Sequence, residues 1–210
     1  HKIVFFIFII ISTAFSYQNE KIEGSYHFEK NNGQLKYQDG SLANDIIYFS
    51  KMKDYNVYFK SDKVIYVFSN YRKTAKDTIL QTYRVDLNFN DCNLNKLTHN
   101  KPTKFYKNYY SKEVKSEIQP CYYEIIYENI YDGIDLKFYF KDGSLKYDFI
   151  LERYSNLKDI KLEYVGYEDL NVTESIIKIQ TPFGNLVDHK PISFQENKLL
   201  KTEFANFENY

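Results

Sequence analysis

The sequence predicts an all-β fold: an antiparallel β-sandwich, or a sandwich-like partly open barrel, of many short strands with little helix. Aromatic residues make up 19% of the chain, as 22 Tyr and 17 Phe without Trp, and both types favour strands. No stretch longer than about 11 residues carries a convincing 3.6-residue hydrophobic period. Short alternating segments recur instead at roughly 8–12 residues, with polar turns between them.

Length and charge limit the classes of protein to which the chain can belong. Its 210 residues suit one globular domain, and 43% hydrophobic with 27% charged residues excludes wholesale disorder. The 28 basic and 28 acidic side chains cancel, which argues against nucleic-acid binding by charge. Without a linker or an internal repeat, we expect residues 17–210 to form a single all-β extracellular domain.

Residues 1–16 have the layout of a secretory signal peptide. Lys2 supplies a positive charge, Ile3–Ile11 is wholly apolar, and the small residues Ala14 and Ser16 follow at signal-peptidase spacing. The apolar run is too short to span a membrane, which needs about 20 residues, although a buried strand is a second interpretation. We therefore expect a secreted or cell-surface protein with no membrane insertion after the signal is removed.

The first strands are predicted from aromatic and β-branched runs around a turn. Tyr55–Lys60 and Val64–Phe68 flank a short polar turn and predict a hairpin. Tyr83–Phe89 alternates polar and apolar residues, as a half-buried strand does. Four later segments behave in the same way: Leu162–Val165, Ile176–Ile179, Ile192–Phe194 and Leu200–Phe204.

The best-determined hairpin is predicted at Ile134–Leu151. Asp142-Gly143 is a favoured type I′ turn pair, and a two-residue loop fixes the register. Lys141 then faces Ser144, Tyr139 faces Lys146 and Lys137 faces Asp148. The predicted core face carries Leu136, Phe138, Phe140, Leu145, Tyr147 and Phe149.

The opposite face of this hairpin carries Asp135 and Asp148, two residues apart in register. Such a pair could serve a carboxylate-dependent hydrolase. We favour an ordinary cross-strand ion pair between Asp148 and Lys137, because no other residue supplies a pocket or a partner. Motifs for nucleophilic, zinc or nucleotide chemistry are also missing from the sequence. The chain is therefore predicted not to be an enzyme, with a hydrolase as the less favoured alternative.

One segment begins like a calcium-binding loop. Asp91, Asn93 and Asn95 place oxygen ligands at alternate positions, but Lys96 and Pro102 stand where an EF-hand needs Gly and Glu. No cofactor is expected, and an irregular calcium site here is a weak alternative.

The two cysteines leave two interpretations open. A bridge between Cys92 and Cys121 would close a loop of about 30 residues and stabilise the fold by roughly 3–4 kcal/mol. Alternatively, they are independent small apolar residues in a sheet, since spacing alone does not bring two sulfurs together.

Several segments, in order, resemble a bacterial extracellular domain of unknown function. That domain stands near the N-terminus of large secreted or surface proteins, ahead of SBBP (β-propeller-type) repeats. Phe28–Gln34 is similar to its opening F-x-x-N-x-G-Q, and Tyr127–Tyr139 to its Y-x-N-x-Y-x-G-I-D-x-x-F-Y. The similarity continues through Leu145–Phe149, Ile160–Gly166, Thr181–Gly184 and Pro191–Glu196, and covers about residues 26–207.

The chain departs from this family at three points. Asp132 stands where the family often has Pro, and Cys92 and Cys121 are not part of its pattern. The family domain also runs on beyond residue 210, so we expect a truncation that removes a final strand or two.

The resemblance implies a non-catalytic structural or adhesive module. Its partners would be the downstream domains of the same polypeptide, and surface glycans or proteins. The resemblance also implies structural roles for Asn32, Gly33, Gln34, Tyr131, Gly133, Asp135, Tyr147 and Asp148. Gly133 would adopt a backbone conformation closed to other residues, and Asp135 would accept hydrogen bonds from turn amides.

The alternative function is a glycan- or ligand-binding β-sandwich. Its sign would be a flat exposed row of tyrosines beside polar side chains. Packing in the core and on the sheets explains most tyrosines equally well.

Overall fold

The computed structural model describes residues 2–5, 26–73, 77–94, 96–109, 118–195, 198–200 and 204–207. Lys2–Phe5 forms a strand, and the rest of the predicted signal peptide lies outside the described residues. Its removal therefore stays a prediction. Within the described part of the chain, no helix is long and apolar enough to cross a membrane.

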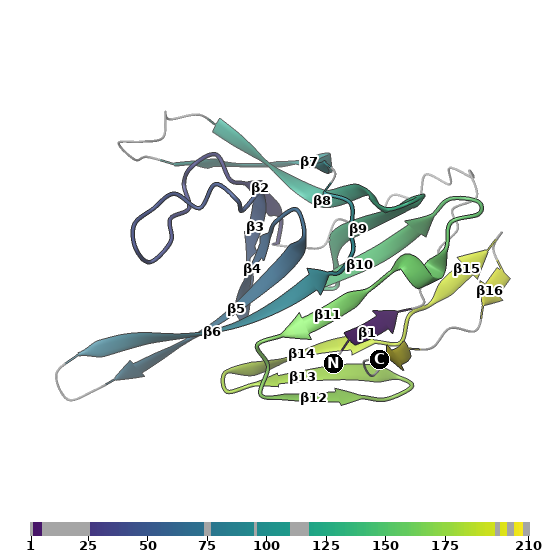
Figure 1. Cartoon of the computed structure of the whole chain (residues 1–210). Coiled ribbons are helices and arrows are strands. Elements are labelled where there is room, and N and C mark those ends of the chain that lie inside the picture. Colours follow the sequence, from purple (N-terminus) through teal and green to yellow (C-terminus); the bar gives the residue numbers. More distant parts are fainter. Residues whose placement is uncertain are drawn as a thin grey trace.

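Most of the described residues belong to one antiparallel sheet, which curls into a half-barrel (Figure 1). The strands are β1 (Lys2–Phe5), β2 (Phe28–Lys30), β3 (Tyr48–Lys51), β4 (Tyr55–Phe59), β5 (Lys63–Lys73), β6 (Thr78–Phe89), β7 (Leu97–Asn108), β8 (Ile118–Tyr131), β9 (Ile134–Lys141), β10 (Ser144–Leu151), β11 (Leu162–Val165) and β17 (Phe204–Phe207). Their order is β10-β9-β8-β2-β3-β4-β5-β6-β11-β1-β17, and β7 pairs with β8 outside this path.

Two small sheets complete the fold. One is β12 (Asp169–Val172), β13 (Ile176–Thr181) and β14 (Gly184–His189), and the other is β15 (Ser193–Gln195) with β16 (Lys198–Leu200). Among the described residues, one 3-10 turn, η1, spans Leu157–Asp159. The prediction of an antiparallel all-β fold with little helix is confirmed, and the main sheet takes the partly open barrel form.

The predicted hairpin at 134–151 is confirmed residue by residue. Strands β9 and β10 pair Lys141 with Ser144, Tyr139 with Lys146, and Lys137 with Asp148. Asp142 and Gly143 have φ angles of 51° and 71°, as a type I′ turn requires. The hairpin β4–β5 and the strands β11 and β13 are also found where the sequence predicted them.

Two strands, β5 and β6, are longer than the sequence predicted, and two long strands, β7 and β8, were not predicted from its pattern. The inner half of β5 is buried, whereas its last five residues are exposed, and β6 is likewise exposed at its start. The pairing nevertheless continues to Lys73 and Thr78, so both strands run out together as an arm (Figure 1). Strands β7 and β8 form a second long pair. The exposed ends of these strands lack an alternation of polar and apolar residues, so the sequence pattern did not predict them.

Aromatic side chains fill the inside of the curl. Edge contacts join Phe28 to Phe59 at 5.4 Å and Phe59 to Phe138 at 5.1 Å between ring centroids. Tyr127 extends the chain of rings to Phe138 at 6.0 Å and to Phe89 at 5.2 Å. The five rings come from β2, β4, β9, β8 and β6, so they tie distant strands together. Such pairs contribute about 0.5–1.5 kcal/mol each beyond simple burial.

The three-stranded sheet packs on the same core. Ile177, Ile179 and Leu186 belong to the buried cluster that fills the main sheet. At Gly184 the backbone lies so close to the Phe68 ring that an added Cβ would sit 3.1 Å from it. Strand β14 is therefore held against the main sheet, and this contact creates the site described next.

Candidate functional site

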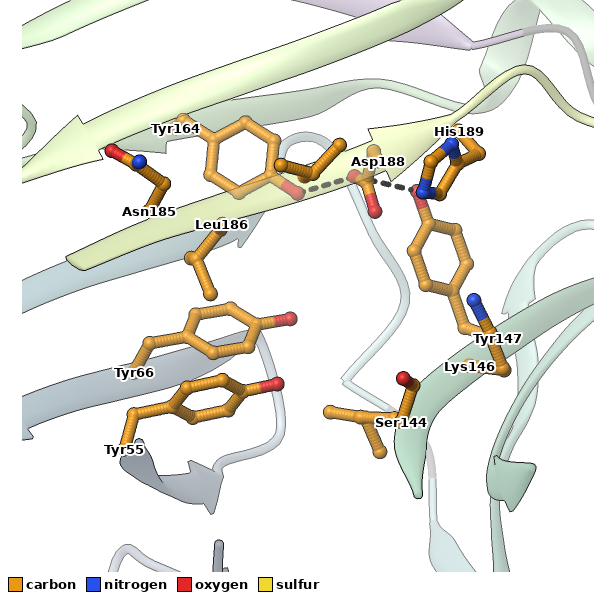
Figure 2. A pocket seen from close by; sticks show the side chains of 12 residues that line it. Tyr55, Tyr66, Ser144, Lys146, Tyr147, Tyr164, Asn185, Leu186, Asp188 and His189 are labelled. Carbon is orange, nitrogen blue, oxygen red and sulfur yellow. Dashed lines mark hydrogen bonds between the residues drawn. The ribbon is translucent and has the colours of Figure 1, made fainter. Parts of the chain in front are cut away.

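A cavity of about 250 Å³ lies where β14 meets the main sheet (Figure 2). Strands β4, β5, β10, β11 and β14 all contribute to it. Its walls are Tyr55, Tyr66, Ser144, Leu145, Lys146, Tyr147, Tyr164, Asn185, Leu186, Val187, Asp188 and His189.

Asp188 occupies an inward position of β14. Side chains two residues apart on a strand share a face, and Leu186, two residues earlier, is buried. In the register with β13, Asp188 lies opposite Ile177, which is fully buried. A carboxylate thus stands on an apolar face of the small sheet. Sequence analysis missed it, because Leu186-Val187-Asp188 places two apolar residues side by side and lacks the alternation that marks the two faces of a strand.

Two tyrosine hydroxyls hold the Asp188 carboxylate. Tyr164 donates to Oδ2 at 2.5 Å and Tyr147 donates to the same oxygen at 3.1 Å (Figure 2). Burial raises the pKa of the Asp188 carboxyl, although these two bonds and the nearby Lys146 and His189 favour its ionised form. Burial also raises the pKa of both tyrosines well above the ordinary value, and the neighbouring carboxylate adds to this.

Tyr55 and Tyr66 form the opposite wall. Their rings meet edge to face, 5.5 Å apart between centroids, and their hydroxyls point into the space bounded by Ser144 and Asp188 (Figure 2). Burial raises the pKa of Tyr55 to about 12, and it also raises the pKa of Tyr66 well above its ordinary value. Neither hydroxyl has a hydrogen-bond partner among the described residues, although Tyr66 is only 6% exposed. The cavity therefore combines aromatic walls with free polar groups.

Asp135 and Asp148 lie outside this cavity, each with its own partner. The Asp148 carboxylate is 3.5 Å from the Lys137 ammonium and accepts the Tyr139 hydroxyl at 3.1 Å. Asp135 accepts the main-chain N–H of Asn129 at 2.6 Å. The predicted ion pair is thus present, and Asp135 accepts a backbone amide as the resemblance implied.

Gly133 and its neighbours build the turn between β8 and β9. Gly133 has a φ of 69°, a left-handed conformation that favours glycine. Its N–H donates to the Asn129 side chain at 2.8 Å, and its carbonyl accepts the N–H of Glu152 at 2.8 Å. An added Cβ would sit 3.3 Å from the Cβ of Ser155. The turn follows an irregular register between Tyr127 and Tyr131.

The tyrosines of this motif tie the turn to other strands. Tyr131 donates its hydroxyl to the Lys161 carbonyl at 3.0 Å and accepts the Lys161 N–H at 3.3 Å. Tyr127 donates to the Lys60 carbonyl at 2.7 Å. Tyr147, also singled out in the sequence, is the residue that reaches the cavity through Asp188.

In the opening motif the main connecting residue is Asn31 rather than Asn32. The Asn31 amide donates to the carbonyls of Ala43 and Ile46, at 2.7 and 2.9 Å. Asn32 contributes its main-chain N–H, which donates to the Gln34 side chain at 2.6 Å. Gly33 has a φ of 97° and donates to the Asn31 side chain. Gln34 donates back to the Lys30 carbonyl at 2.7 Å, which closes the loop.

Cys92 and Cys121 are both free thiols in the structure, so the bridge considered from the sequence is not formed. Cys121 lies near the start of β8, whereas Asn93, next to Cys92, donates to the Ile130 carbonyl near its end. At about 3.3 Å per residue, these points lie roughly 30 Å apart along the strand. A disulfide cannot span that distance.

The oxygen-rich segment after β6 is occupied by protein contacts. Asp91 lies 2.6 Å from the Lys161 ammonium, and the Asn93 amide donates to Asp132 at 3.0 Å. Asn95 lies outside the described residues. Among the residues that are described, no group of three or more His, Cys, Asp or Glu side chains could hold a metal.

Fold and contacts together define an all-β domain whose motif residues hold turns and whose small sheet closes a polar, tyrosine-walled cavity. The chain belongs to the family described as a domain of unknown function, DUF7948, whose sequence profile matches residues 28–206. No curated protein and no solved structure shows significant similarity to it. The resemblance to a domain of unknown function is thereby confirmed, whereas neighbouring SBBP repeats and an extracellular location stay predictions.

Proposed function

We propose that this domain is a non-catalytic structural or adhesive module of a large exported bacterial surface protein, in which it acts beside downstream domains. The observation that carries the proposal is how the residues of the longer family motif are used. The Asp135 side chain accepts the Asn129 N–H, and the Asn129 side chain accepts the Gly133 N–H. Tyr127 and Tyr131 donate to the carbonyls of Lys60 and Lys161, which lie beside other strands. Because these side chains form the hydrogen bonds of a turn and connect it to other parts of the sheet, they support a structural role.

Exposed apolar side chains on the two long strand pairs support contact with partners. Tyr71 on β5 is 70% exposed, Tyr106 on β7 is 65% exposed and Ile118 on β8 is 68% exposed. Tyr71 and Tyr106 lie toward strand ends where burial has ceased, and Ile118 is the exposed first residue of β8. Single exposed apolar residues are ordinary, but their placement on projecting pairs suits adhesion to a neighbouring surface.

The test compares cells that carry the full-length protein with cells in which residues 26–207 are deleted in frame. We expect the deletion to reduce either surface display of the remaining protein or attachment of the cells. The double variant Tyr71→Ser, Tyr106→Ser should keep display and reduce attachment if the module is adhesive. Unchanged display and attachment after the deletion would contradict the proposal.

A second assay addresses the hydrolase alternative. The purified chain is incubated with chromogenic glycosides and esters across a range of pH, beside an Asp148→Asn variant. We expect no turnover by either protein. Turnover that disappears in the variant would replace the structural proposal with a carboxylate-dependent hydrolase.

Glycan or ligand binding remains the second candidate function. The exposed row of tyrosines that would mark a flat glycan platform is not formed among the described residues. The exposed ones are scattered over a loop (Tyr37), two different strands (Tyr71 and Tyr106) and the segment after β10 (Tyr154). Tyrosines gather instead inside the cavity around Asp188, and this observation favours a small ligand.

A further inference from the structure

The cavity around Asp188 has the dimensions and walls of a site for one small ring. Its volume of about 250 Å³ lies below the roughly 300–1,000 Å³ of pockets for drug-sized molecules. Tyr55, Tyr66, Tyr147 and Tyr164 give it aromatic faces from four different strands (Figure 2). Aromatic faces pack well against the C–H face of a ring that is polar at its edge.

The polar groups of the cavity are incompletely used by the protein. Both tyrosine hydrogen bonds to Asp188 fall on Oδ2, which leaves Oδ1 to accept a further donor. The Tyr66 hydroxyl lacks a partner among the described residues, although the residue is more than nine-tenths buried and its hydroxyl points into the cavity (Figure 2). The hydroxyl oxygen itself is not sealed from solvent, so it is accessible to a molecule in the cavity. A ligand with several hydroxyls would satisfy these groups.

The charges around the cavity favour a neutral ligand. A quaternary ammonium ion would suit tyrosine faces beside a carboxylate, but the ammonium group of Lys146 lines the same cavity and opposes a second cation. Asp188 in turn opposes an anion. A neutral polyhydroxylated ring both donates and accepts hydrogen bonds, so it matches the mixture of carboxylate, ammonium and hydroxyl groups.

We infer that this cavity binds one neutral sugar ring, with its C–H face on the tyrosines and its hydroxyls on Asp188, Tyr66 and Ser144. The site is separate from the exposed ends of β5 and β7 on which the adhesive proposal rests. A result that contradicts sugar binding in the cavity therefore does not contradict the adhesive proposal, and the reverse also holds.

The experiment titrates the full chain with methyl glycosides of glucose, galactose, mannose and N-acetylglucosamine, monitored by saturation-transfer NMR and calorimetry. We expect at least one glycoside to bind saturably with a dissociation constant of about 1 mM, as suits a small exchangeable ligand. Tyr66→Phe should weaken that binding about fivefold, because it removes one hydrogen bond and keeps the ring. Asp188→Asn should weaken it about tenfold, because a charged acceptor is lost.

The matched control is Tyr127→Phe. Tyr127 is as buried as Tyr66, but its hydroxyl is bonded to the Lys60 carbonyl and it lies outside the cavity. This variant should bind the glycoside as the unaltered chain does. Circular dichroism confirms that each variant is folded, and Tyr66→Phe with Ser144→Ala carries the test if Asp188→Asn does not fold.

Three results would overturn the inference. The first is no saturable binding of any glycoside up to about 10 mM by a folded chain, well above the expected dissociation constant. The second is binding that Tyr66→Phe and Asp188→Asn leave unchanged. The third is tighter binding of tetramethylammonium chloride than of every glycoside, which would assign the cavity to a cation.

Discussion

The carboxylate of Asp135 accepts the main-chain N–H of Asn129 at 2.6 Å, so one acidic side chain fixes the bend by which β8 turns into β9. The Asn129 side chain accepts the N–H of Gly133 at 2.8 Å in the same turn. The two bonds interlock, because Asn129 is held through its main chain and itself holds the glycine.

Removing the Asp135 carboxylate should therefore lower stability more than removing that of Asp148. Asp135→Ala should reduce the free energy of unfolding by about 1–2 kcal/mol, since a charge-assisted hydrogen bond to the turn is lost. Asp148→Ala breaks a partly exposed ion pair with Lys137 and the bond from the Tyr139 hydroxyl, and should cost about 1 kcal/mol or less. Urea denaturation measures both, and equal losses would show that the turn does not depend on Asp135.

Gly166 should tolerate alanine less well than Gly133. An added Cβ at Gly166 would lie 2.6 Å from the Arg84 carbonyl oxygen, whereas at Gly133 the closest atom is a side-chain carbon at 3.3 Å. Gly133→Ala should cost about 1–2 kcal/mol from its left-handed backbone. Gly166→Ala should cost about 2–5 kcal/mol, because backbone must also move. Thermal melting of both variants checks the order, and the reverse order would contradict it.

The ring of Phe138 should stabilise the fold through its aromatic neighbours. It is fully buried and contacts the rings of Phe59 and Tyr127 edge to face. Phe138→Leu should lower the free energy of unfolding by about 1–2 kcal/mol through imperfect packing and lost ring contacts. Phe105, 55% exposed, supplies the matched control, and Phe105→Leu should stay within about 0.5 kcal/mol. Similar urea midpoints for the two variants would argue against the aromatic chain as a source of stability.

Asp188 should make the folded chain less stable as pH rises through the acidic range. Burial raises the pKa of its carboxyl, despite the bonds from Tyr164 and Tyr147 and the charges of Lys146 and His189. The folded chain therefore holds this proton more tightly than the unfolded chain. Its contribution to stability is full below the unfolded pKa of about 3.9 and is lost as pH rises through the folded value.

Comparison with Asp188→Asn isolates this effect. The carboxyl pKa values of Glu29, Asp45 and Asp86 are lowered, so their contributions are lost as pH falls, equally in both proteins. The stability of the variant relative to the unaltered chain should rise with pH over the window above about pH 4. Parallel urea midpoints across that window would show that Asp188 is not held in a protonated form.

Both thiols should resist alkylation until the chain unfolds. Burial, followed by the charge of Glu29, raises the pKa of Cys121 to about 11, and burial with the charge of Asp62 raises that of Cys92. Because the thiolate is the reactive form, iodoacetamide should label neither residue quickly near neutral pH. In urea without reductant, mass spectrometry should find both cysteines labelled. Labelling that requires prior reduction would reveal a disulfide.

A strand could be predicted from the sequence only where its own residues alternate between polar and apolar or adjoin a recognisable turn. The β9–β10 hairpin could be predicted, because an Asp-Gly turn and strict alternation coincide. Strand β7 carries no such pattern, because it contains Pro102 and is mostly exposed. Its place in the sheet depends on its pairing with β8. The strand predicted at Leu200–Phe204 falls between the end of β16 and the start of β17. Residues 201–203 lie outside the described part of the chain.

The cavity could not have been predicted from any one segment. Tyr66, Tyr147, Tyr164 and Asp188 come from four strands, three of which belong to the main sheet and one to the small sheet. Only the packing of β14 on the main sheet places them together. The structural residues of the motif were easier to predict, because a glycine and an acid close to a turn act locally.

Strand β8 also has a consequence for the order of events in folding. One of its edges is bonded to β7, and along the other edge β2 and β9 are both bonded, at different residues. Phe28 thus has no strand partner on one side until Tyr122 has been made. Because the chain is synthesised from its N-terminus, one edge of β2 stays unpaired while β3 to β7 are made. Because pairings between distant segments form slowly, folding of this domain should be slow and should not finish before β8 is made. A chain halted before residue 118 should leave the edge of β2 unpaired and should associate with other chains through it.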